Sequence, residues 1–440
     1  MNLLPILNNS LPDTPIFWFK NKLVTHEKFK LDVLLAAENL THHKYAINLC
    51  EDRYLFAVAF AASMVQKHVC LMPAHRAEKE IAELEKKYSD TQRLDDQQLE
   101  IFLNNAAKNK IAFPLEINSE QLVAIVFTSG SSGKPKANHK KWGALFDSAL
   151  RVATQLKLNQ PTQHSLIATV PPQHMYGFET TIIFPLVTGV CVHNSKPFFP
   201  EDIRQTLNTV KGNPILITTP IHLRACSQAN LEWPNIDFVL CATAPLSVEL
   251  AHEAEQQLQT KLYEIYGCSE AGVIATRKTT QNLDWSLLAD YKLSKNLTGV
   301  CLITPASKEE ILLSDQIEFV DSRTFRLLGR QSDLIKIAGK RGSLNDLKIK
   351  ICAMDGIDDA VFFMPDENPD EKARLAAFVV APNLSIKEIN SFLSPQIDNA
   401  FMPRPLIKVK SLPYNETGKL LRKNLVNLFL QNRSKLKNSA

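Results

Sequence analysis

Short apolar runs alternate with longer amphipathic stretches along most of this chain, and no other feature of the sequence limits its fold as strongly. Residues 45–50 and 68–72 read as short strands, and residues 52–67 between them have the length and apolar spacing of a helix. The alternation continues from an apolar strand at 121–127 to a helix at 247–259. Strands and helices in this order are typical of βαβ units on parallel sheets. We therefore expect an α/β fold whose largely parallel sheets are flanked by helices.

The pattern changes after Asp315. Short, charged strands at 316–320 and 324–328 lead into Gly329-Arg330, and the rest of the chain has an alternation of its own. A chain of 440 residues exceeds what one hydrophobic core usually supports, and the last part has the size of a small domain. We predict a large N-terminal domain over residues 1–329 and a small α+β C-terminal domain over residues 330–440.

Composition and charge narrow the class of protein. The formal net charge of +4 is small for this length and gives no reason to expect nucleic acid as a partner. The eight cysteines include no CxxC pair and no His/Cys ligand spacing, which argues against structural zinc and against a disulfide framework. The longest apolar stretches, such as 180–192, are shorter than the roughly 18 to 20 residues that a membrane helix needs, and the N-terminus makes a poor signal peptide. We expect a cytoplasmic protein without a membrane span.

The sharpest local signal is a loop of small residues and lysines at 128–136, directly after the apolar strand at 121–127. Small residues let the backbone approach a polyphosphate, hydroxyl and N–H groups donate to its oxygens, and lysines neutralise its charge. The loop is not a Walker A sequence, because Thr128 stands where the first glycine belongs and Pro135 follows Lys134 in place of Ser or Thr. The alternative is a flexible surface turn, which clusters of Gly, Ser and Lys often form.

Further short motifs follow the loop in a fixed order. They are Pro172-Gln173-His174-Met175-Tyr176-Gly177, Ala242-Thr243-Ala244-Pro245-Leu246, Tyr266-Gly267-Cys268-Ser269-Glu270, Asp315 followed by Gly329-Arg330, Gly339-Lys340-Arg341, and Pro413-Tyr414-Asn415-Glu416-Thr417-Gly418-Lys419. Together with the loop, this set resembles the adenylate-forming superfamily of acyl-CoA synthetases, aryl and fatty acyl ligases, and peptide-synthetase adenylation domains. The resemblance implies an enzyme that activates a carboxylic acid with ATP as an acyl-adenylate, releases pyrophosphate, and passes the acyl group to a thiol.

The resemblance also implies a role for each matched position. The expected ATP contacts are the phosphate loop (Thr128, Ser129, Gly130, Ser131, Ser132, Gly133, Lys134 and Lys136), the adenine loop (Ala242, Thr243, Ala244 and Pro245) with Tyr266 and Gly267, Ser269 at the α-phosphate, and Asp315 at the ribose hydroxyls. Glu270 would bind Mg²⁺, a hard cation suited to carboxylate and phosphate oxygens. Lys419 is the expected catalytic lysine, because an ammonium can bridge the substrate carboxylate and the α-phosphate as their negative charges meet. Its alternative role is that of an ordinary solvated lysine.

Two further expectations concern the acyl site and the second half-reaction. His174 is expected to act as a gate or wall of the acyl site, and its alternative is a packed, hydrogen-bonded core histidine. In the family the small domain is mobile and swings about the segment after Arg330, so that a phosphopantetheine arm can enter a tunnel that Gly339 would line. The thiol would belong to CoA or to a holo-acyl carrier protein. From Arg330 onward 18 lysines and arginines stand against 12 aspartates and glutamates, an excess that could attract either partner.

Some positions depart from the family pattern. Ser332 stands where the family usually has an Asp or Lys pivot, Thr243 replaces a glycine of the adenine loop, Leu313-Ser314 replace Thr-Gly before Asp315, and Gly342 replaces an apolar residue. Ser269 stands in place of Thr and keeps the hydroxyl. None of these changes removes a charged catalytic group, and we therefore expect an active enzyme.

The substrate expectation rests on the segment around His174. Residues 171–178 contain no carboxylate and Glu179 lies late, which disfavours an amino acid as substrate. Residues 171–179, 264–271 and 339–344 are similar to the compact ligases of aryl-polyene and xanthomonadin-type pigment pathways. Those ligases load a hydroxybenzoic or related aromatic acid onto an acyl carrier protein. A medium-chain fatty acid is the main rival.

Two other functions stay open from the sequence. A nucleotide-binding scaffold or pseudoenzyme of the same fold would be consistent with Ser332 and Thr243, whereas Glu270, Asp315 and Lys419 oppose it. A luciferase-like oxidative enzyme would share the adenylation step and the same motifs.

Overall fold

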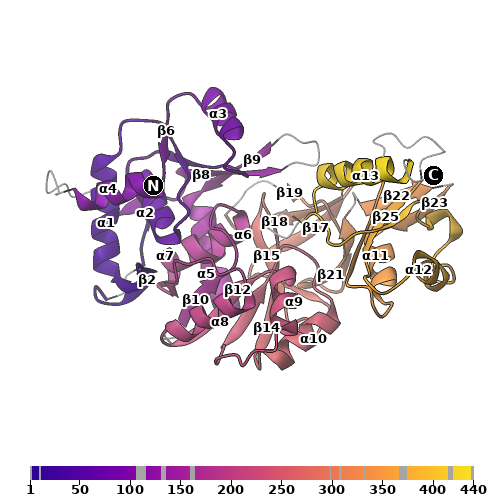
Figure 1. Ribbon diagram of the computed structural model, residues 1–440. Coiled ribbons are helices and arrows are strands. Elements are labelled where there is room, and N and C mark those ends of the chain that lie inside the picture. The colour runs from indigo at the N-terminus through magenta and orange to yellow at the C-terminus, as the bar shows by residue number, and fades with distance from the viewer. Residues whose placement is uncertain are drawn as a thin grey trace. The chain divides into compact units, whose positions relative to one another are not determined.

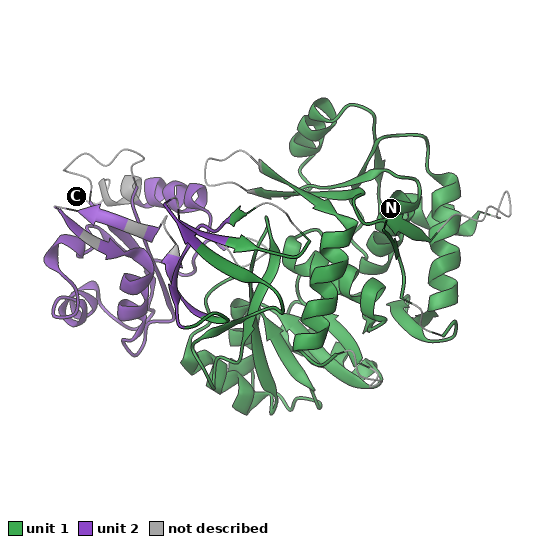
Figure 2. Ribbon diagram, turned by 180° about the vertical axis from the view of Figure 1, so that it is seen from behind, with its two compact units in different colours: residues 1–294, 302–311, 321–324 green, residues 295–301, 312–320, 325–440 purple. Residues whose placement is uncertain are grey.

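The computed structural model describes residues 2–8, 11–105, 115–129, 135–158, 164–297, 299–306, 310–330, 333–337, 339–365, 374–414 and 420–437. It divides into two compact units (Figure 2). Unit 1 comprises Met1–Ser294, Leu302–Ile311 and Asp321–Thr324, and unit 2 comprises Lys295–Cys301, Leu312–Val320 and Phe325–Ala440. The domain boundary at residues 329 and 330 stays a prediction.

The first sheet of unit 1 has five strands in the order β6-β4-β5-β8-β9. Figure 1 labels β6, β8 and β9 of this sheet. Their bounds are Thr91–Leu94, Tyr45–Asn48, Val69–Met72, Leu122–Ser129 and Pro135–Lys141. Strands β6, β4, β5 and β8 run parallel, and β9 returns antiparallel to β8. The helices of this region are α1 (His26–Asn39), α2 (Arg53–Val65), α3 (Glu78–Lys87) and α4 (Asp96–Asn104).

The second sheet of unit 1 runs in the order β16-β15-β14-β13-β12-β10-β11-β2-β3. The bounds are Trp285–Leu287, Gly272–Arg277, Lys261–Cys268, Phe238–Cys241, Asn213–Thr218, His164–Ala168, Cys191–Val192, Pro15–Phe19 and Lys22–Thr25. Strands β14, β13, β12, β10, β11 and β2 are parallel to their neighbours in that series, and β15 is antiparallel to β14. The expected α/β fold with largely parallel sheets is confirmed.

Helices cover the second sheet with apolar side chains. They are α5 (Trp142–Gln155), α8 (Pro200–Thr209), α9 (Pro220–Gln228) and α10 (Val248–Gln257). Leu216 and Val239 of the strands share one buried cluster with Ile203, Leu223 and Leu250 of the helices. Burying one apolar face of each helix against the sheet is what fixes these layers.

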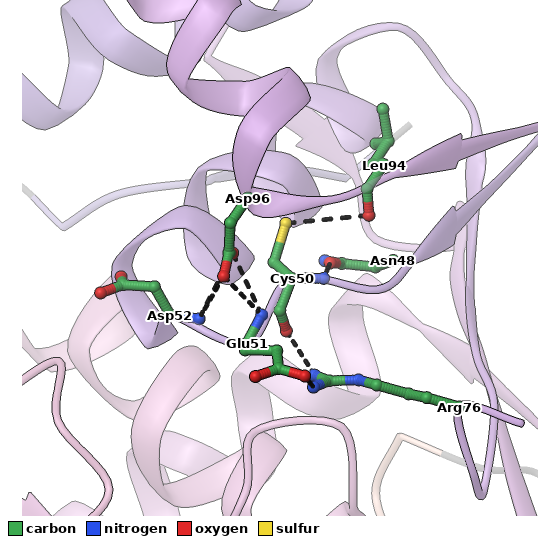
Figure 3. Close-up of polar contacts among 7 residues, drawn as sticks. All are labelled: Asn48, Cys50, Glu51, Asp52, Arg76, Leu94 and Asp96. Carbon is green, nitrogen blue, oxygen red and sulfur yellow. Dashed lines mark hydrogen bonds and ion pairs between the residues drawn. The ribbon is translucent and has the colours of Figure 1, made fainter.

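The turn between β4 and α2 is held by side chains from other segments (Figure 3). The carboxylate of Asp96 accepts the main-chain N–H groups of Glu51 and Asp52 at 3.0 to 3.3 Å, and Arg76 donates to the main-chain carbonyl of Cys50. The side chain of Asp52 in turn accepts the N–H groups of the first turn of α2, as a helix N-cap does.

Arg53, the first residue of α2, is buried and ties this helix to the second sheet. Its guanidinium donates to the carbonyls of His193 and Ser195 at 2.8 and 2.7 Å and to those of Ala168 and Val170 at 3.3 and 2.8 Å. A buried charge is tolerated when most of its donors are paired, as both terminal nitrogens of Arg53 are; the buried Nε has no partner among the described residues. Burial still lowers the pKa of Arg53, to about 10.

Unit 2 is a small α+β unit, as expected. Its strands are β20 (Asp315–Phe319), β21 (Thr324–Arg330, whose first residue belongs to unit 1), β22 (Leu334–Ile337), β23 (Lys340–Ser343), β24 (Asp359–Phe363), β25 (Ala376–Val380) and β26 (Leu406–Lys408), and its helices are α11 (Leu344–Cys352), α12 (Ile386–Leu393) and α13 (Arg422–Lys437). Leu347, Ile351 and Ile389 of the helices pack with Ala377 and Val379 of β25. The mobility of this unit stays a prediction.

Packing explains why residue 342 is a glycine here, in place of the apolar residue of the family pattern. A Cβ at this position would lie 2.8 to 3.1 Å from atoms of the Phe401 ring. The ring therefore occupies the space that a side chain at residue 342 would need. The departure noted in the sequence is compensated by a neighbour from a distant segment.

The remaining short elements are β1 (Leu3–Pro5), β7 (Glu116–Asn118), α6 (Met175–Phe178), η1 (Glu179–Ile183), α7 (Phe184–Thr188), β17 (Lys292–Asn296), β18 (Gly299–Ile303), β19 (Ile311–Leu312) and η3 (Asn399–Phe401). Among the residues that the structure describes, no helix combines the length and the apolar character needed to cross a bilayer.

Candidate active site

Strand β9 presents two lysines to Glu270. Side chains alternate along a strand, so Lys136, Asn138 and Lys140 lie on one face of β9. The Lys136 Nζ donates to the Glu270 Oε1 at 2.6 Å, and the Lys140 Nζ donates to the Glu270 main-chain carbonyl at 2.8 Å. One strand therefore holds both the carboxylate and the backbone of Glu270.

The hairpin of β8 and β9 brings the ends of the phosphate loop together. Thr128 pairs with Lys136 and Ser129 pairs with Pro135 across the hairpin. The Asn138 Nδ2 approaches the Thr128 Oγ1 at 3.5 Å from the middle of β9. The predicted phosphate-binding residues between these ends lie outside the described residues: Gly130, Ser131, Ser132, Gly133 and Lys134.

Lys136 and Glu270 are both accessible and both charged. Their side chains are 62% and 37% exposed. Burial would raise the pKa of Glu270, but the hydrogen bond and the charge of Lys136 hold that pKa below its ordinary value, and Glu270 in turn raises the pKa of Lys136. An ionised carboxylate is a ligand that Mg²⁺ prefers, and an exposed ammonium suits a phosphate. The donor chemistry of this pair therefore fits the expected Mg²⁺ and polyphosphate.

The turn that carries Ser269 and Glu270 is tightly built. It joins the antiparallel strands β14 and β15, whose register shifts between Tyr266 and Gly267. A Cβ at Gly267 would lie 2.4 Å from the Gly272 carbonyl oxygen. Gly272 has a φ of +81°, and a Cβ there would lie 2.3 Å from the Glu179 Oε1. Both positions require glycine, and this keeps Ser269 and Glu270 on a short, fixed connection.

The predicted adenine loop follows β13, the strand beside β14. Because these neighbouring strands are parallel, residues 242–245 after β13 and residues 269–270 after β14 lie at the same edge of the sheet. The N–H of Ala242 donates to the Thr218 carbonyl at 3.3 Å, whereas Ala244 is half-buried and Pro245 exposed. The ring of Tyr266 is buried and packs against that of Trp285, with 5.7 Å between the ring centroids.

Thr243 is strained within this loop. Its φ is +85°, a region that β-branched residues rarely adopt. Its Oγ1 is buried, and among the described residues it has no hydrogen-bond partner. The family glycine at this position would carry neither cost. The departure seen in the sequence thus corresponds to a residue that destabilises its own loop.

Replacing Thr243 with Gly is expected to stabilise the protein by about 1 kcal/mol, because relief of the strained φ outweighs the extra entropy of an unfolded glycine. Urea unfolding followed by fluorescence measures the change. Thr243→Ala is the matched control, since it removes the hydroxyl but keeps the Cβ, and its gain should be smaller. Equal gains from the two variants would show that the buried hydroxyl, rather than the φ, is the source of the instability.

His174 lies partly buried just before α6. Two contacts hold its segment: the Tyr176 hydroxyl donates to the Leu240 carbonyl at 2.7 Å, and a Cβ at Gly177 would lie 2.0 Å from the Pro171 carbonyl oxygen. The segment is therefore fixed against β13, the strand that precedes the adenine loop. A role for His174 in the acyl site stays a prediction.

Two buried ionisable residues next to the Glu270 turn, Glu179 and Lys140, received no functional role from the sequence. Glu179 begins η1 and accepts from the Val273 N–H and the Ser148 hydroxyl, each at 3.4 Å. Burial raises the pKa of Glu179 to about 7, and the charge of Lys140 opposes that rise. Burial also lowers the pKa of Lys140. The signal for Lys140 in the sequence is its spacing from Lys136, which places both lysines on one face of a strand.

The other predicted site residues belong to unit 2. Asp315 is half-buried and pairs with Arg330 across the β20–β21 hairpin. Gly339 has a φ of +79°, and a Cβ there would meet no atom of the described residues within 4 Å. Lys419 and Ser332 lie outside the described residues.

The segment that contains Lys419 is anchored at both described ends. Tyr414 and Leu420 form an isolated antiparallel bridge. The Tyr414 hydroxyl donates to the Asp359 Oδ2 at 2.5 Å, and Lys348 forms an ion pair with Asp359 at 2.9 Å. The residue before the segment and the residue after it are therefore fixed to the small unit.

Comparisons with known proteins agree on one class. A family model described as "AMP-binding enzyme" matches residues 34–305. A 4-coumarate–CoA ligase of Halorhodospira halophila is 25% identical over 67% of this chain and 73% of its own length. A 3,4-dihydroxybenzoate–[aryl-carrier protein] ligase of Bacillus anthracis is 22% identical over 70% and 74%. The structure of o-succinylbenzoate CoA synthetase from Bacillus subtilis with its acyl-adenylate intermediate has a TM-score of 0.82 at 16% identity and covers 97% of this chain and 98% of its own.

Proposed function

The chain belongs to the AMP-binding enzyme family of adenylate-forming acid ligases, and from this premise we propose that it activates an aromatic carboxylic acid with ATP and transfers the acyl group to a phosphopantetheine thiol. The observation that carries the proposal is the contact of Lys136 with Glu270. It joins the end of a phosphate loop to a carboxylate suited to Mg²⁺. These are the two groups that binding of MgATP requires.

The proposed first step joins two anions. A carboxylate oxygen of the acid forms a bond to the α-phosphorus of ATP, the bond between the α-phosphorus and the bridging oxygen breaks, and pyrophosphate leaves with the electron pair. Lys136 would hold the outer phosphates, and the ammonium of Lys419 would stabilise the charge between the acid and the α-phosphate. Mg²⁺, held by Glu270, would neutralise phosphate oxygens. The loop at 242–245 and Tyr266 would hold adenine, and Asp315 the ribose.

The proposed second step consumes the acyl-adenylate. A thiolate forms a bond to the carbonyl carbon, the bond from that carbon to the phosphate oxygen breaks, and AMP leaves. The thiol would belong to a holo-acyl carrier protein or to CoA, which share the phosphopantetheine arm. By resemblance, Arg330 would be the interdomain arginine that precedes the hinge segment, and Gly339 would line the tunnel.

An aromatic acid is supported by two relatives, and an amino acid is opposed by the contacts of Glu179. The two relatives named above are ligases of 4-coumarate and of 3,4-dihydroxybenzoate. Glu179, the only carboxylate near the His174 segment in the sequence, accepts from Val273 and Ser148. A buried carboxylate engaged in this way is a poor partner for a substrate amine.

Acid-dependent exchange of labelled pyrophosphate into ATP tests the proposed function. We expect exchange above the no-acid background with hydroxybenzoic or cinnamic acids and not with amino acids. Exchange with medium-chain fatty acids alone would replace the aromatic assignment. No exchange across a broad acid panel would favour a nucleotide-binding scaffold of this fold. Supplying CoA and a holo-carrier protein in parallel then identifies the acceptor by which thioester forms.

A further inference from the structure

We infer that Lys140 and Glu179 are positioning residues that hold the backbone from the Glu270 carbonyl to the Val273 N–H, so that the Glu270 carboxylate meets Mg²⁺ in one geometry. The inference rests on the proposed function, because that function gives Glu270 its role. It assigns a task to two buried ionisable side chains that no step of the proposed reaction uses. All the contacts involved lie within unit 1.

Lys140 holds the start of the turn, at Glu270. Its side chain is buried, and its Nζ donates to the Glu270 carbonyl oxygen at 2.8 Å. Removing an ammonium from water is costly, and an apolar residue would fit a buried strand position without that cost. The position also shares a face with Lys136, which donates to the carboxylate of the same residue. Lys136 therefore contacts the reactive end of Glu270, and Lys140 fixes its main chain.

Glu179 holds the end of the turn. Its Oε1 accepts from the N–H of Val273, three residues after Glu270, at 3.4 Å, and it lies 2.3 Å from where a Cβ of Gly272 would be. Ser148 of α5 donates to the same oxygen at 3.4 Å. Glu179 begins η1, so this contact connects the turn to an element that is distant in sequence.

The two buried side chains influence each other. Of the charged groups that act on the pKa of either side chain, the other member of the pair acts most strongly, although Lys140 and Glu179 form no direct ion pair. Lys140 contacts the Glu270 carbonyl and Glu179 contacts the Val273 N–H, so the pair holds the first and the last residue of 270–273. A carboxylate whose adjoining backbone is held loses less freedom when it binds a metal, and this pre-organisation favours affinity.

Binding of ATP at increasing Mg²⁺, measured by calorimetry without any acid, tests the inference. Lys140→Met keeps the length of the side chain and removes the ammonium. We expect the half-saturating Mg²⁺ concentration to rise about tenfold, with ATP affinity close to wild type at saturating Mg²⁺. Glu179→Gln should shift the Mg²⁺ dependence in the same direction. The double variant should be no worse than Lys140→Met, because the residues act as one unit.

Lys141→Met is the matched control. Lys141 is the neighbour of Lys140 on β9, but it is exposed and pairs with Glu120 at 2.8 Å. This variant should leave the Mg²⁺ dependence unchanged. An unchanged Mg²⁺ dependence in both Lys140→Met and Glu179→Gln would overturn the inference, and so would a loss of ATP binding that is equal at all Mg²⁺ concentrations and follows a loss of folded protein. Because the readout needs no acid, absence of pyrophosphate exchange in the wild type would contradict the proposed function separately.

Discussion

Lys419→Ala is expected to lower acyl-adenylate formation by a factor of about 10² to 10³ and to leave thioester formation from supplied acyl-adenylate near the wild-type rate. The first step brings a carboxylate against the α-phosphate, and an ammonium between them stabilises charge that exists only as they meet. The second step begins from a neutral acyl carbonyl and expels AMP. Single-turnover formation of labelled acyl-AMP measures the first step, and a synthetic acyl-adenylate with a thiol measures the second.

The role of Lys419 comes from the family resemblance, and the structure describes its anchors. Tyr414 is fixed to Asp359 and bridges to Leu420, and all three residues are unchanged in the variant. Lys423→Ala is the control, since Lys423 is an exposed lysine in the first turn of α13. It should affect neither step. Equal loss of both steps in Lys419→Ala would contradict the role that we assign to this lysine.

The parallel layers of the fold could be predicted because their signals are local. The helix predicted at 52–67 is α2 (Arg53–Val65), capped by Asp52, and the helix predicted at 247–259 is α10 (Val248–Gln257). Helix α2 is buried along its whole length and is recognised by that length, whereas the buried residues of α10 recur with the period of a helix. Strand β9 had no such signal, because residues 135–141 include three lysines and no apolar alternation. It is a strand because β8 pairs with it.

The residues of the candidate site could be predicted from the sequence where a motif contains them. They could not be predicted where a contact between distant segments determines their position. The sequence pointed to Lys136 and Glu270 separately, but their 2.6 Å contact joins segments 134 residues apart. Thr243 was visible as a departure, whereas its positive φ and its buried hydroxyl were not. The contact of Glu179 with Val273 spans 94 residues. A residue's local sequence carries no information about contact partners that lie so far away along the chain. This is why Lys140 and Glu179 received no role from the sequence.

Glu270→Gln is expected to reduce pyrophosphate exchange by a factor of about 10² to 10³ without a matching loss of stability. The amide keeps the shape of the side chain but removes the negative charge that Mg²⁺ requires of this position. The lost ion pair with Lys136 is accessible to solvent. Such pairs contribute only about 0 to 1 kcal/mol to the free energy of unfolding.

Glu120→Gln separates the loss of a metal ligand from the loss of a surface ion pair. Glu120 pairs with Lys141 at 2.8 Å, and both side chains are exposed, so this variant breaks a comparable contact away from the site. It should change neither exchange nor stability, whereas Glu270→Gln should lose exchange at an unchanged midpoint of urea unfolding. The lost exchange should also recover in part at high Mg²⁺, because mass action opposes a weakened site. Full exchange by Glu270→Gln at low Mg²⁺ would rule out Glu270 as the metal ligand. The contacts of Lys136 and Lys140 with Glu270 would then not serve metal binding.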